Sequence, residues 1–365
     1  MIDLANYGYI ENELPPEGLL PARITAVHRE RYELVSENGT QYGQLKTSVY
    51  YGREEQVFPT VGDFVLFAPV PGGDCQITKT LPRRSYFARL DPDPVGGKQQ
   101  AVAANFDYVY IMTSLNKDFN VNRVERYVVL TRQSGAVPVV ILTKADLTGD
   151  IDTLVAEVHI VAGGIDVIPV SIVSGMGLDR LDSYLSPGKT IVFLGMSGVG
   201  KSSLLNTLMG QDVMTVKTIR EDDSRGRHTT THRQLFTLPP RVGAPSGAMV
   251  IDTPGMRSLG MLEADVGLSE TYADIEALIS MCRFTDCSHE SEPGCAVRAA
   301  IESGDLHASR LQSYLSLQRE SAYAERKAAY LKIKQARNKE IAVWSRHTKK
   351  TKGKEWRTNP SNMGG

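Results

Sequence analysis

The sequence predicts a multidomain α/β protein with three folded parts: an N-terminal OB-like β-barrel, a central parallel sheet with helices on both faces, and a C-terminal helical domain around a metal site. Short β segments separated by turn residues between positions 20 and 81 predict the barrel. Apolar strands that alternate with helices from residue 108 predict the parallel sheet. A cluster of cysteines and a histidine near residue 290 predicts the metal site.

Composition limits the class of protein. The 365 residues have room for two or three domains, each with a core of its own. The longest apolar runs, such as residues 136–142, are far too short to cross a bilayer, so no membrane contact is expected. Residues 1–17 are acidic without a basic start, so we expect no signal peptide and a cytoplasmic location. Three of the four cysteines are clustered, which favours metal over disulfides.

Charge is distributed unevenly along the chain. Between Glu325 and Arg357 twelve Lys/Arg face three Glu, an excess of nine positive charges, although the whole chain has a net charge of -1. The preceding residues therefore carry a net charge of about -10. This asymmetry indicates that the C-terminal segment meets a polyanion. The alternative is a solvated helix face followed by a loose tail.

The N-terminal region reads as a small barrel. Residues 1–17 show no periodicity and are expected to form a loose arm, and residues 18–84 contain five short strands with Asn38-Gly39 as a hairpin turn. OB barrels often bind RNA or single strands, but this one has few clustered aromatics, so a docking role is an equal alternative. The Pro- and Gly-rich residues 85–100 are predicted to be a linker.

A phosphate-binding loop lies at the centre of residues 101–262. Apolar residues 191–194 read as a buried strand, and residues 195–202 then fit G-x-x-x-x-G-K-[ST]. The glycines permit a nest of backbone N–H groups, Lys201 supplies charge for the outer phosphates, and the Ser202 hydroxyl is a ligand for Mg²⁺. A helix begins after the loop and adds its positive N-terminal end. The predicted phosphate-binding residues are Gly195, Met196, Ser197, Gly198, Val199, Gly200, Lys201, Ser202 and Ser203. The alternative is a glycine-rich turn without a ligand.

Two earlier strand ends are predicted to bind the base. Strand 137–142 ends in Thr143-Lys144-Ala145-Asp146, where the Asp146 carboxylate can accept from guanine N1–H and its exocyclic amine while the Lys144 stem packs over the ring. This stretch resembles the NKxD motif of GTPases, with Thr143 in place of Asn. Strand 167–170 leads to Ser171, which is similar to the start of the SAK element that supports the base. Its alternative role is an ordinary helix or turn cap.

Two segments after the loop are predicted to act at the γ-phosphate. Residues 211–231 form a long polar stretch ending in three threonines, of which Thr230 is expected to close on Mg²⁺. Strand 248–251 ends in Asp252-Thr253-Pro254-Gly255, where Asp252 holds a metal-bound water and the Gly255 N–H touches the γ-phosphate. A plain Pro-Gly turn is the alternative reading of this second segment.

The order of these elements is unusual. Guanine elements precede the phosphate loop, whereas ordinary GTPases place that loop first, so the order indicates a circularly permuted P-loop GTPase domain. This order, with the Arg225–Thr231 loop, resembles the RsgA family (also YjeQ or YloQ) over nearly the whole chain. The resemblance implies hydrolysis of GTP to GDP with Mg²⁺, stimulation by the small (30S) ribosomal subunit, rRNA binding and a role in late small-subunit maturation.

One catalytic part departs from the usual GTPase pattern. Met256 stands where many GTPases have a water-positioning Gln, so slow intrinsic turnover is expected. His228 is the candidate substitute, and a loop histidine without a catalytic role is the equal alternative. The predicted catalytic residues are His228, Thr230, Lys201 and Asp252. Gly198 replaces the Asn of potassium-activated relatives, which argues against potassium dependence by that route.

The predicted zinc ligands are Cys282, Cys287, His289 and Cys295. Three thiols and one imidazole within fourteen residues complete a tetrahedral set with no open position, so the site should be structural. The resemblance implies a zinc domain here, assigned to residues 263–345, followed by a basic disordered tail over 346–365. A chance cluster in a loop is the alternative.

Two other function classes stay open at this point. A GTPase switch of another cellular process would not need the barrel, the zinc module and the basic tail. A non-catalytic RNA-binding zinc protein would not need the nucleotide motifs. Salt-sensitive binding to ribosomal subunits would argue against the first class. GTP turnover would argue against the second class. The protein is expected to act as a monomer.

Overall fold

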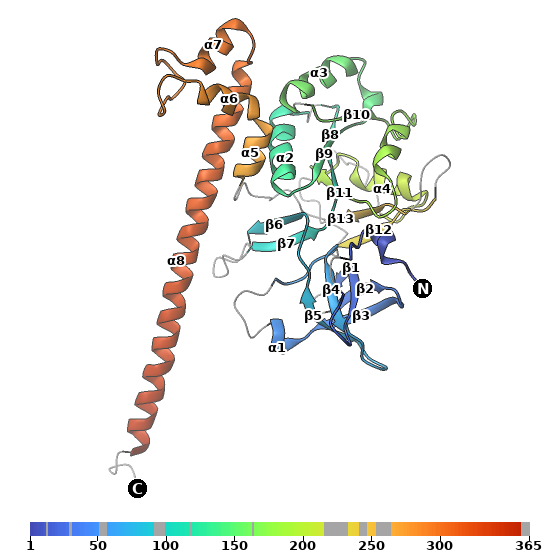
Figure 1. The fold of residues 1–365 in the computed structure, drawn as a ribbon, viewed down its shortest axis with the longest axis vertical. Helices are drawn as coiled ribbons and strands as arrows, with labels where there is room; N and C mark the ends of the chain where they lie inside the picture. The colour runs from blue at the N-terminus through green and yellow to red at the C-terminus, as the bar shows by residue number, and fades with distance from the viewer. Residues whose placement is uncertain are drawn as a thin grey trace, which may run out of the picture.

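The computed structural model describes residues 1–11, 14–28, 31–50, 57–90, 99–116, 119–162, 164–214, 233–240, 247–252 and 264–358. Figure 1 shows a barrel at one end, a parallel sheet flanked by helices in the middle, and one very long C-terminal helix. Within the described part, no helix is both long enough and apolar enough to span a membrane.

The N-terminal strands close into a five-stranded barrel. They are β1 (Leu20–His28), β2 (Arg31–Ser36), β3 (Gly39–Leu45), β4 (Phe64–Ala68) and β5 (Cys75–Thr80). They pair in the order β1-β2-β3-β5-β4, and β4 pairs with β1 to close the ring. β3 and β5 are parallel, and the other pairs are antiparallel. Closure leaves the barrel few open strand edges, and the predicted OB-like barrel is confirmed.

Two segments near the barrel differ from the prediction. Residues 1–17 were expected to be a loose arm, but Leu4–Tyr7 form a short 3-10 helix, η1, and Leu4 is buried. Residues 85–100 were expected to be a linker, but β6 (Tyr86–Leu90) pairs antiparallel with β7 (Gln99–Ala104). Buried Phe87 stacks on Phe106, with ring centroids 4.9 Å apart. This apolar contact holds the β6–β7 strand pair in place.

The central sheet has the order β10-β9-β8-β11-β13-β12. Its strands are β8 (Tyr108–Ser114), β9 (Val137–Thr143), β10 (Val167–Val170), β11 (Thr190–Gly195), β12 (Gln234–Thr237) and β13 (Met249–Asp252). All neighbours are parallel except β12 and β13. The parallel strands are mostly apolar on both faces because helices cover both, as parallel sheets require.

Side chains of β8 show how the two faces are covered. Val109 and Ile111 join the core under α2 (Val121–Gln133) and α3 (Ile151–Ala162). Tyr110 and Met112 join the core under α4 (Lys201–Met209). The predicted parallel sheet with helices on both faces is therefore confirmed.

The barrel and the central sheet are continuous. Ala26 of β1 pairs antiparallel with Gln234 of β12, so the strands form one eleven-stranded sheet. The fully buried Arg23 guanidinium donates to the Asn105 carbonyl at 2.8 Å and to the Gly62 carbonyl at 3.2 Å. Burial lowers the pKa of Arg23 to about 9. A buried cation bonded to both parts holds the barrel in a fixed position against the sheet.

The C-terminal helices dock on the face covered by α2 and α3. They are α5 (Asp265–Thr271), α6 (Ala273–Ser280), α7 (Ala296–Ser303) and α8 (Ala308–Thr358). Buried Arg310 of α8 donates to the Asp274 carboxylate at 2.8 Å, to the Thr271 carbonyl at 2.8 Å and to the Val161 carbonyl at 3.2 Å. Arg310 thereby ties α8 to its own domain and to α3.

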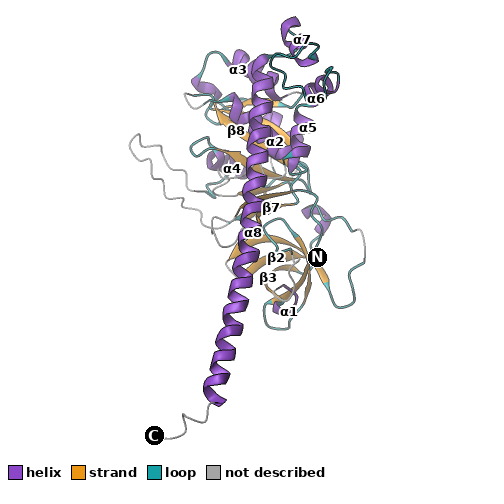
Figure 2. Cartoon of the chain, turned by 90° about the vertical axis from the view of Figure 1, so that its left-hand side faces the viewer, coloured by secondary structure: helices purple, strands orange, loops and turns teal. Residues whose placement is uncertain are grey.

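Helix α8 is longer than expected. Its 51 residues span about 76 Å, and it stands apart from the barrel as a single helix (Figure 1) while crossing in front of the sheet in the perpendicular view (Figure 2). Residues 346–365 were predicted to be a disordered tail, whereas the helix continues to Thr358. The helix as a whole is rich in Ala, Lys, Arg and Glu, and no proline interrupts it before Pro360.

One buried carboxylate at this interface lacks a close partner. Glu125 of α2 is fully buried, neither carboxylate oxygen has a hydrogen bond within the described residues, and Arg310 Nη1 lies 3.9 Å away. Burial raises the pKa of Glu125, and the nearby Tyr272 and Ser313 hydroxyls and the charge of Arg310 oppose this shift. Because the pKa of Glu125 is higher in the folded state than in the unfolded state, protonated Glu125 favours folding. This contribution to the free energy of unfolding is lost as pH rises through the folded-state pKa.

We therefore expect Glu125→Gln to raise the free energy of unfolding by about 1 kcal/mol near neutral pH, because a neutral amide is less costly to bury than a carboxylate. The gain should vanish below the ordinary glutamate pKa of about 4.3. Urea unfolding across this pH range measures it, with exposed Glu157→Gln as the control. A variant that is less stable than the wild type near neutral pH, but not below about pH 4.3, would show that the fold requires the charged form.

Candidate functional site

The sequence-predicted nucleotide residues gather at one edge of the central sheet. β9, β10, β11 and β13 are parallel, so their carboxyl ends lie at the same edge. The chain runs outward from β8 to β10 and then returns to β11 on the other side of β8. The crevice at such a change of direction is where open α/β sheets bind ligands. Asp146, Ser171, Lys201 and Asp252 all follow or end strands at this edge.

The loop between β11 and α4 has the form that a phosphate site needs. A Cβ at Gly195 would lie 2.4 Å from the Met112 carbonyl oxygen, so only glycine fits. Gly200 has φ 103°, a left-handed conformation that turns the chain into α4. Lys201 Nζ donates to the carbonyl oxygens of Gly195 and Met196 at 2.6 and 2.7 Å. The lysine charge is thus held across the loop, where it can meet an anion.

Thr143 connects the predicted base-binding strand to this loop. Its hydroxyl donates to the Val199 carbonyl at 2.7 Å, and its side chain is buried. The hydroxyl thereby holds the loop against the end of β9, and the predicted place of Thr143 in the nucleotide site stays a prediction. The polar side chain at this position therefore fixes the phosphate loop relative to the predicted base-binding segment.

Asp146 is oriented by a second strand end. It lies in η2 (Ala145–Leu147), which follows Lys144 in a left-handed conformation with φ 57°. The Ser171 hydroxyl donates to Asp146 Oδ1 at 2.5 Å. Ser171 is itself buried and accepts from the Ser174 N–H at 3.2 Å. This pairing brings together the two predicted base-binding elements, and it aims a carboxylate in the way that reading a base edge requires.

Asp252, the predicted holder of a metal-bound water, ends β13 near the Lys201 charge. It ends β13 opposite Gln234, and burial raises its pKa while the nearby charge of Lys201 lowers it. Ser202 is in the first turn of α4, beside Lys201. Hydroxyl and carboxylate oxygens are the donors that Mg²⁺ prefers, so these two residues fit that ion. His228, Thr230 and Gly255 lie outside the described residues, and their roles stay predictions.

The structure also presents apolar residues at this edge that the sequence analysis did not single out. Val173, Leu147 and Met176 are 87%, 64% and 46% exposed. Each stands within a few residues of a base-binding position. Their position directly after the motif residues could have pointed to them. The sequence alone, however, does not show which side chains of a loop are exposed.

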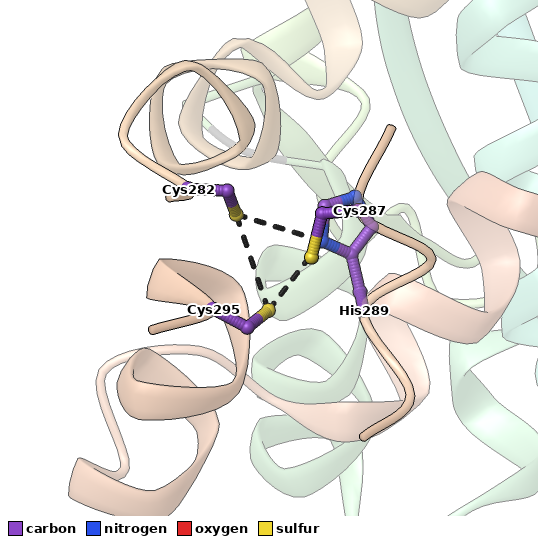
Figure 3. A group of neighbouring side chains, drawn as sticks. All are labelled: Cys282, Cys287, His289 and Cys295. Atoms are coloured by element: carbon purple, nitrogen blue, oxygen red, sulfur yellow. Dashed lines mark hydrogen bonds between the residues drawn. The ribbon is translucent and has the colours of Figure 1, made fainter. Parts of the chain in front are cut away.

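The four predicted zinc ligands converge (Figure 3). Ligand atoms of Cys282, Cys287, His289 and Cys295 all lie within 4.8 Å of one another. The Sγ atoms of Cys282 and Cys295 are 3.9 Å apart, and His289 Nδ1 lies 3.7 and 3.5 Å from them. Zn–S bonds of about 2.3 Å in a tetrahedron place neighbouring sulfurs about 3.8 Å apart. The cluster is therefore compatible with one zinc ion.

Local structure explains this convergence. Cys282 follows the end of α6, and Cys295 is the N-cap of α7, accepting from the Arg298 N–H at 3.4 Å. His289 has φ 63°, which turns its ring back toward the sulfurs. Gly294 is also left-handed and packs against the Arg283 side chain. Two helix ends and two tight turns thus position the four side chains.

Comparison with known proteins is consistent with this geometry. Residues 80–262 match the family model described as RsgA GTPase. A relative from Lactiplantibacillus plantarum, named small ribosomal subunit biogenesis GTPase RsgA 2, is 45% identical over 327 residues, covering 88% of this chain and 90% of the relative.

Two solved structures share the fold. YjeQ from Thermotoga maritima has a TM-score of 0.60 at 24% identity, covering 82% of this chain and 97% of that one. YloQ, described as a circularly permuted GTPase, has a TM-score of 0.58 at 25% identity, covering 85% and 97%. The predicted permutation is thus confirmed, and the chain belongs to the RsgA GTPase family.

Proposed function

We propose that this protein hydrolyses GTP to GDP and phosphate and acts in late maturation of the small (30S) ribosomal subunit, as a monomer in the cytoplasm. The observation that carries the proposal is the arrangement of Asp146, Lys201 and Asp252 at one sheet edge. Two hydrogen bonds, Thr143 to Val199 and Ser171 to Asp146, hold the base and phosphate elements together.

Each residue at this edge has a distinct role. The Asp146 carboxylate accepts from guanine N1–H and the exocyclic amine, donors that adenine lacks at those positions. Lys201 and the backbone N–H groups of residues 195–203 hold the phosphates. Mg²⁺, when bound, neutralises charge on the β- and γ-phosphates; Ser202 and Thr230 would be its ligands, and Asp252 would hold its water. His228 would orient the attacking water, because Met256 has no group that can.

The zinc cluster has a structural role in this proposal. Four protein ligands leave no open position for a substrate, so one Zn²⁺ would bind without taking part in chemistry. The ion would link the end of α6 to the start of α7 and so support the base of α8.

The C-terminal helix is the proposed RNA contact. Its buried side chains include Arg310, Leu311, Tyr314, Leu317 and Ser321, all in the first turns. The excess of nine positive charges begins after these residues, at Glu325. A projecting helix with this excess would bind rRNA phosphates by releasing counterions. Relatives named for small-subunit biogenesis support the ribosomal subunit as the source of that RNA.

The test is GTP turnover with small subunits, with large subunits and with neither. Small subunits should raise the rate at least about tenfold, about 1.4 kcal/mol of barrier, by ordering the catalytic residues. Large subunits should not. His228→Ala should lower the stimulated rate without abolishing GTP binding. Equal rates with and without small subunits at low salt would refute the ribosomal role and favour a GTPase of another process. Absence of turnover in every condition would favour a non-catalytic RNA-binding protein.

Truncation after Glu325 separates binding from chemistry. It keeps the α8 side chains that are buried among the described residues, the last of which is Ser321, and removes the basic part. Subunit binding should weaken and lose much of its salt dependence, while intrinsic turnover should stay unchanged. An unchanged salt dependence would place the RNA contact elsewhere in the protein.

A further inference from the structure

The projecting part of α8 carries large apolar side chains among its positive charges. After Ser321, none of the α8 side chains that the structure describes is buried. In this part Tyr323, Tyr330 and Ile333 are 67%, 64% and 70% exposed. The helix stands apart from the barrel here (Figure 1), so the fold itself does not cover these side chains. Exposed apolar side chains that recur along one element indicate a surface that meets a partner.

The two tyrosines share one face of the helix with basic residues. A helix turns by about 100° per residue, so Tyr330 lies only about 20° around the axis from Tyr323. Four exposed cations fall with the tyrosines in an arc of about 100°, and they are Arg326, Lys327, Lys334 and Arg337. Together with the two tyrosines they form the tyrosine face. Glu325 is the one acid in the sequence between residues 323 and 337, and it lies about 160° from Tyr323, on the far side.

Charge decides which partner such a face attracts. The segment from Glu325 to Arg357 carries an excess of nine positive charges. A second copy of α8 would bring two such segments together, and their repulsion disfavours pairing of the helix with itself. A polyanion is attracted instead, and relatives named for small-subunit biogenesis make RNA the polyanion in question.

The tyrosine rings indicate which form of RNA fits. In a duplex the bases are already stacked on one another, and the phosphates need only the cations of the face. Unpaired bases offer flat surfaces that stack on aromatic side chains, while the cations follow the backbone of the strand. A face in which rings alternate with Lys and Arg therefore suits single-stranded RNA better than a duplex.

We propose that the tyrosine face binds a single-stranded segment of RNA, with Tyr323 and Tyr330 stacked on unpaired bases and the four cations on the phosphates. The inference rests on the proposed function, in which α8 contacts rRNA, and it adds which form of RNA the helix recognises. The two tyrosines are seven residues apart, about 10.5 Å along the axis. Nucleotides stacked in one strand are about 3.4 Å apart, so this interval holds about three of them. The whole face, from Tyr323 to Arg337, spans about 21 Å, or about six nucleotides.

Binding of two probes to the full-length protein tests this inference. One probe is a single strand of about ten uridines, and the other is an RNA duplex of about the same length. Tyr323→Ala combined with Tyr330→Ala should weaken the single strand at least about tenfold, because each ring that stacks on a base is lost. The duplex should bind within about twofold of its wild-type affinity, because the cations remain. The salt dependence should be unchanged, since no charge is removed.

Two further variants isolate the rings. Tyr323→Phe combined with Tyr330→Phe keeps both rings and should bind both probes as the wild type does. Gln318→Ala is the matched control on α8, because Gln318 is exposed and lies about 140° around the axis from Tyr323. It should change neither affinity. Alanine is a good helix former, so the alanine variants should keep the helix content of the wild type, which circular dichroism measures.

Several results would overturn the stacking contact alone. Equal binding of the single strand by the double alanine variant and the wild type would show that the rings meet no base. An equal loss for the duplex, or the same loss in the double phenylalanine variant, would show that the tyrosine hydroxyls bind the RNA backbone instead. If the double alanine variant binds both probes normally but no longer binds small subunits, the face meets a ribosomal protein. A wild-type dimer that dissociates in this variant would make the face a contact between two copies of the chain.

Failure of the proposed function looks different. A wild type that binds neither probe, and whose binding to small subunits survives truncation after Glu325, would remove α8 as the RNA contact and the stacking with it. A wild type that binds the single strand through the two rings, but whose GTP turnover small subunits do not raise, would keep the stacking and refute the ribosomal role.

Discussion

Asp146→Asn is expected to reverse the base preference, with GTP affinity falling about hundredfold and xanthosine triphosphate becoming the better ligand. One of the two charge-assisted hydrogen bonds to guanine would be lost, worth about 1.5–3 kcal/mol, because the asparagine amide offers one acceptor oxygen in place of two. Xanthine presents an oxygen at C2, which the asparagine N–H₂ can meet. The fold should be unaffected, because the amide oxygen of asparagine can still accept from the Ser171 hydroxyl.

Competition of GTP, ATP and xanthosine triphosphate for the labelled-GDP site measures this reversal. Asp150→Asn is the matched control, since Asp150 is an exposed acid four residues further along the same segment. It should leave the preference for GTP intact. If ATP competes as well as GTP against the wild type, the assignment of Asp146 to guanine is wrong.

Removing one zinc ligand is expected to unfold the C-terminal metal region. Cys287→Ser should abolish zinc binding and disorder the segment between α6 and α7, because structural zinc contributes on the order of 10 kcal/mol in small sites. Arg310 would still tie α8 to α3, and the nucleotide edge draws its residues from other elements. GDP affinity should therefore remain within about twofold of the wild-type value, because the zinc cluster and the nucleotide edge share no residues and should act independently.

Zinc content and limited proteolysis check this prediction together. The wild type should carry one zinc ion per chain, and the variant none, with new cleavage between residues 282 and 295. Cys75→Ser is the control, because Cys75 is a buried barrel cysteine outside the cluster and its loss should not change the zinc content. Freshly purified wild type without zinc, in the absence of chelators, would contradict the assignment.

Some features follow from the sequence because they are local or periodic. The phosphate loop and the TKAD stretch fill consecutive positions after apolar strands, so their place at strand ends is readable from the chain. The spacing of the three cysteines and His289 allows one tetrahedral site, and the ligand atoms do converge. Alternating turns and short strands likewise predict a barrel, and the order of the motifs predicts the permutation that is described for YloQ.

Other features were decided by contacts between distant residues, which no local pattern encodes. Arg23 reads as a surface cation in a strand, yet it is fully buried and bonded to Asn105, 82 positions away. Residues 85–100 resemble a linker by composition, but Phe87 stacks on Phe106, and β6 and β7 pair as two antiparallel strands. The sequence places Thr143 at the end of a strand but does not show that its hydroxyl bonds Val199, which it does because β9 and the loop after β11 end at the same edge. Turn residues and apolar periodicity determine which elements form, whereas long-range burial and hydrogen bonding determine which side chains stay free to meet a ligand.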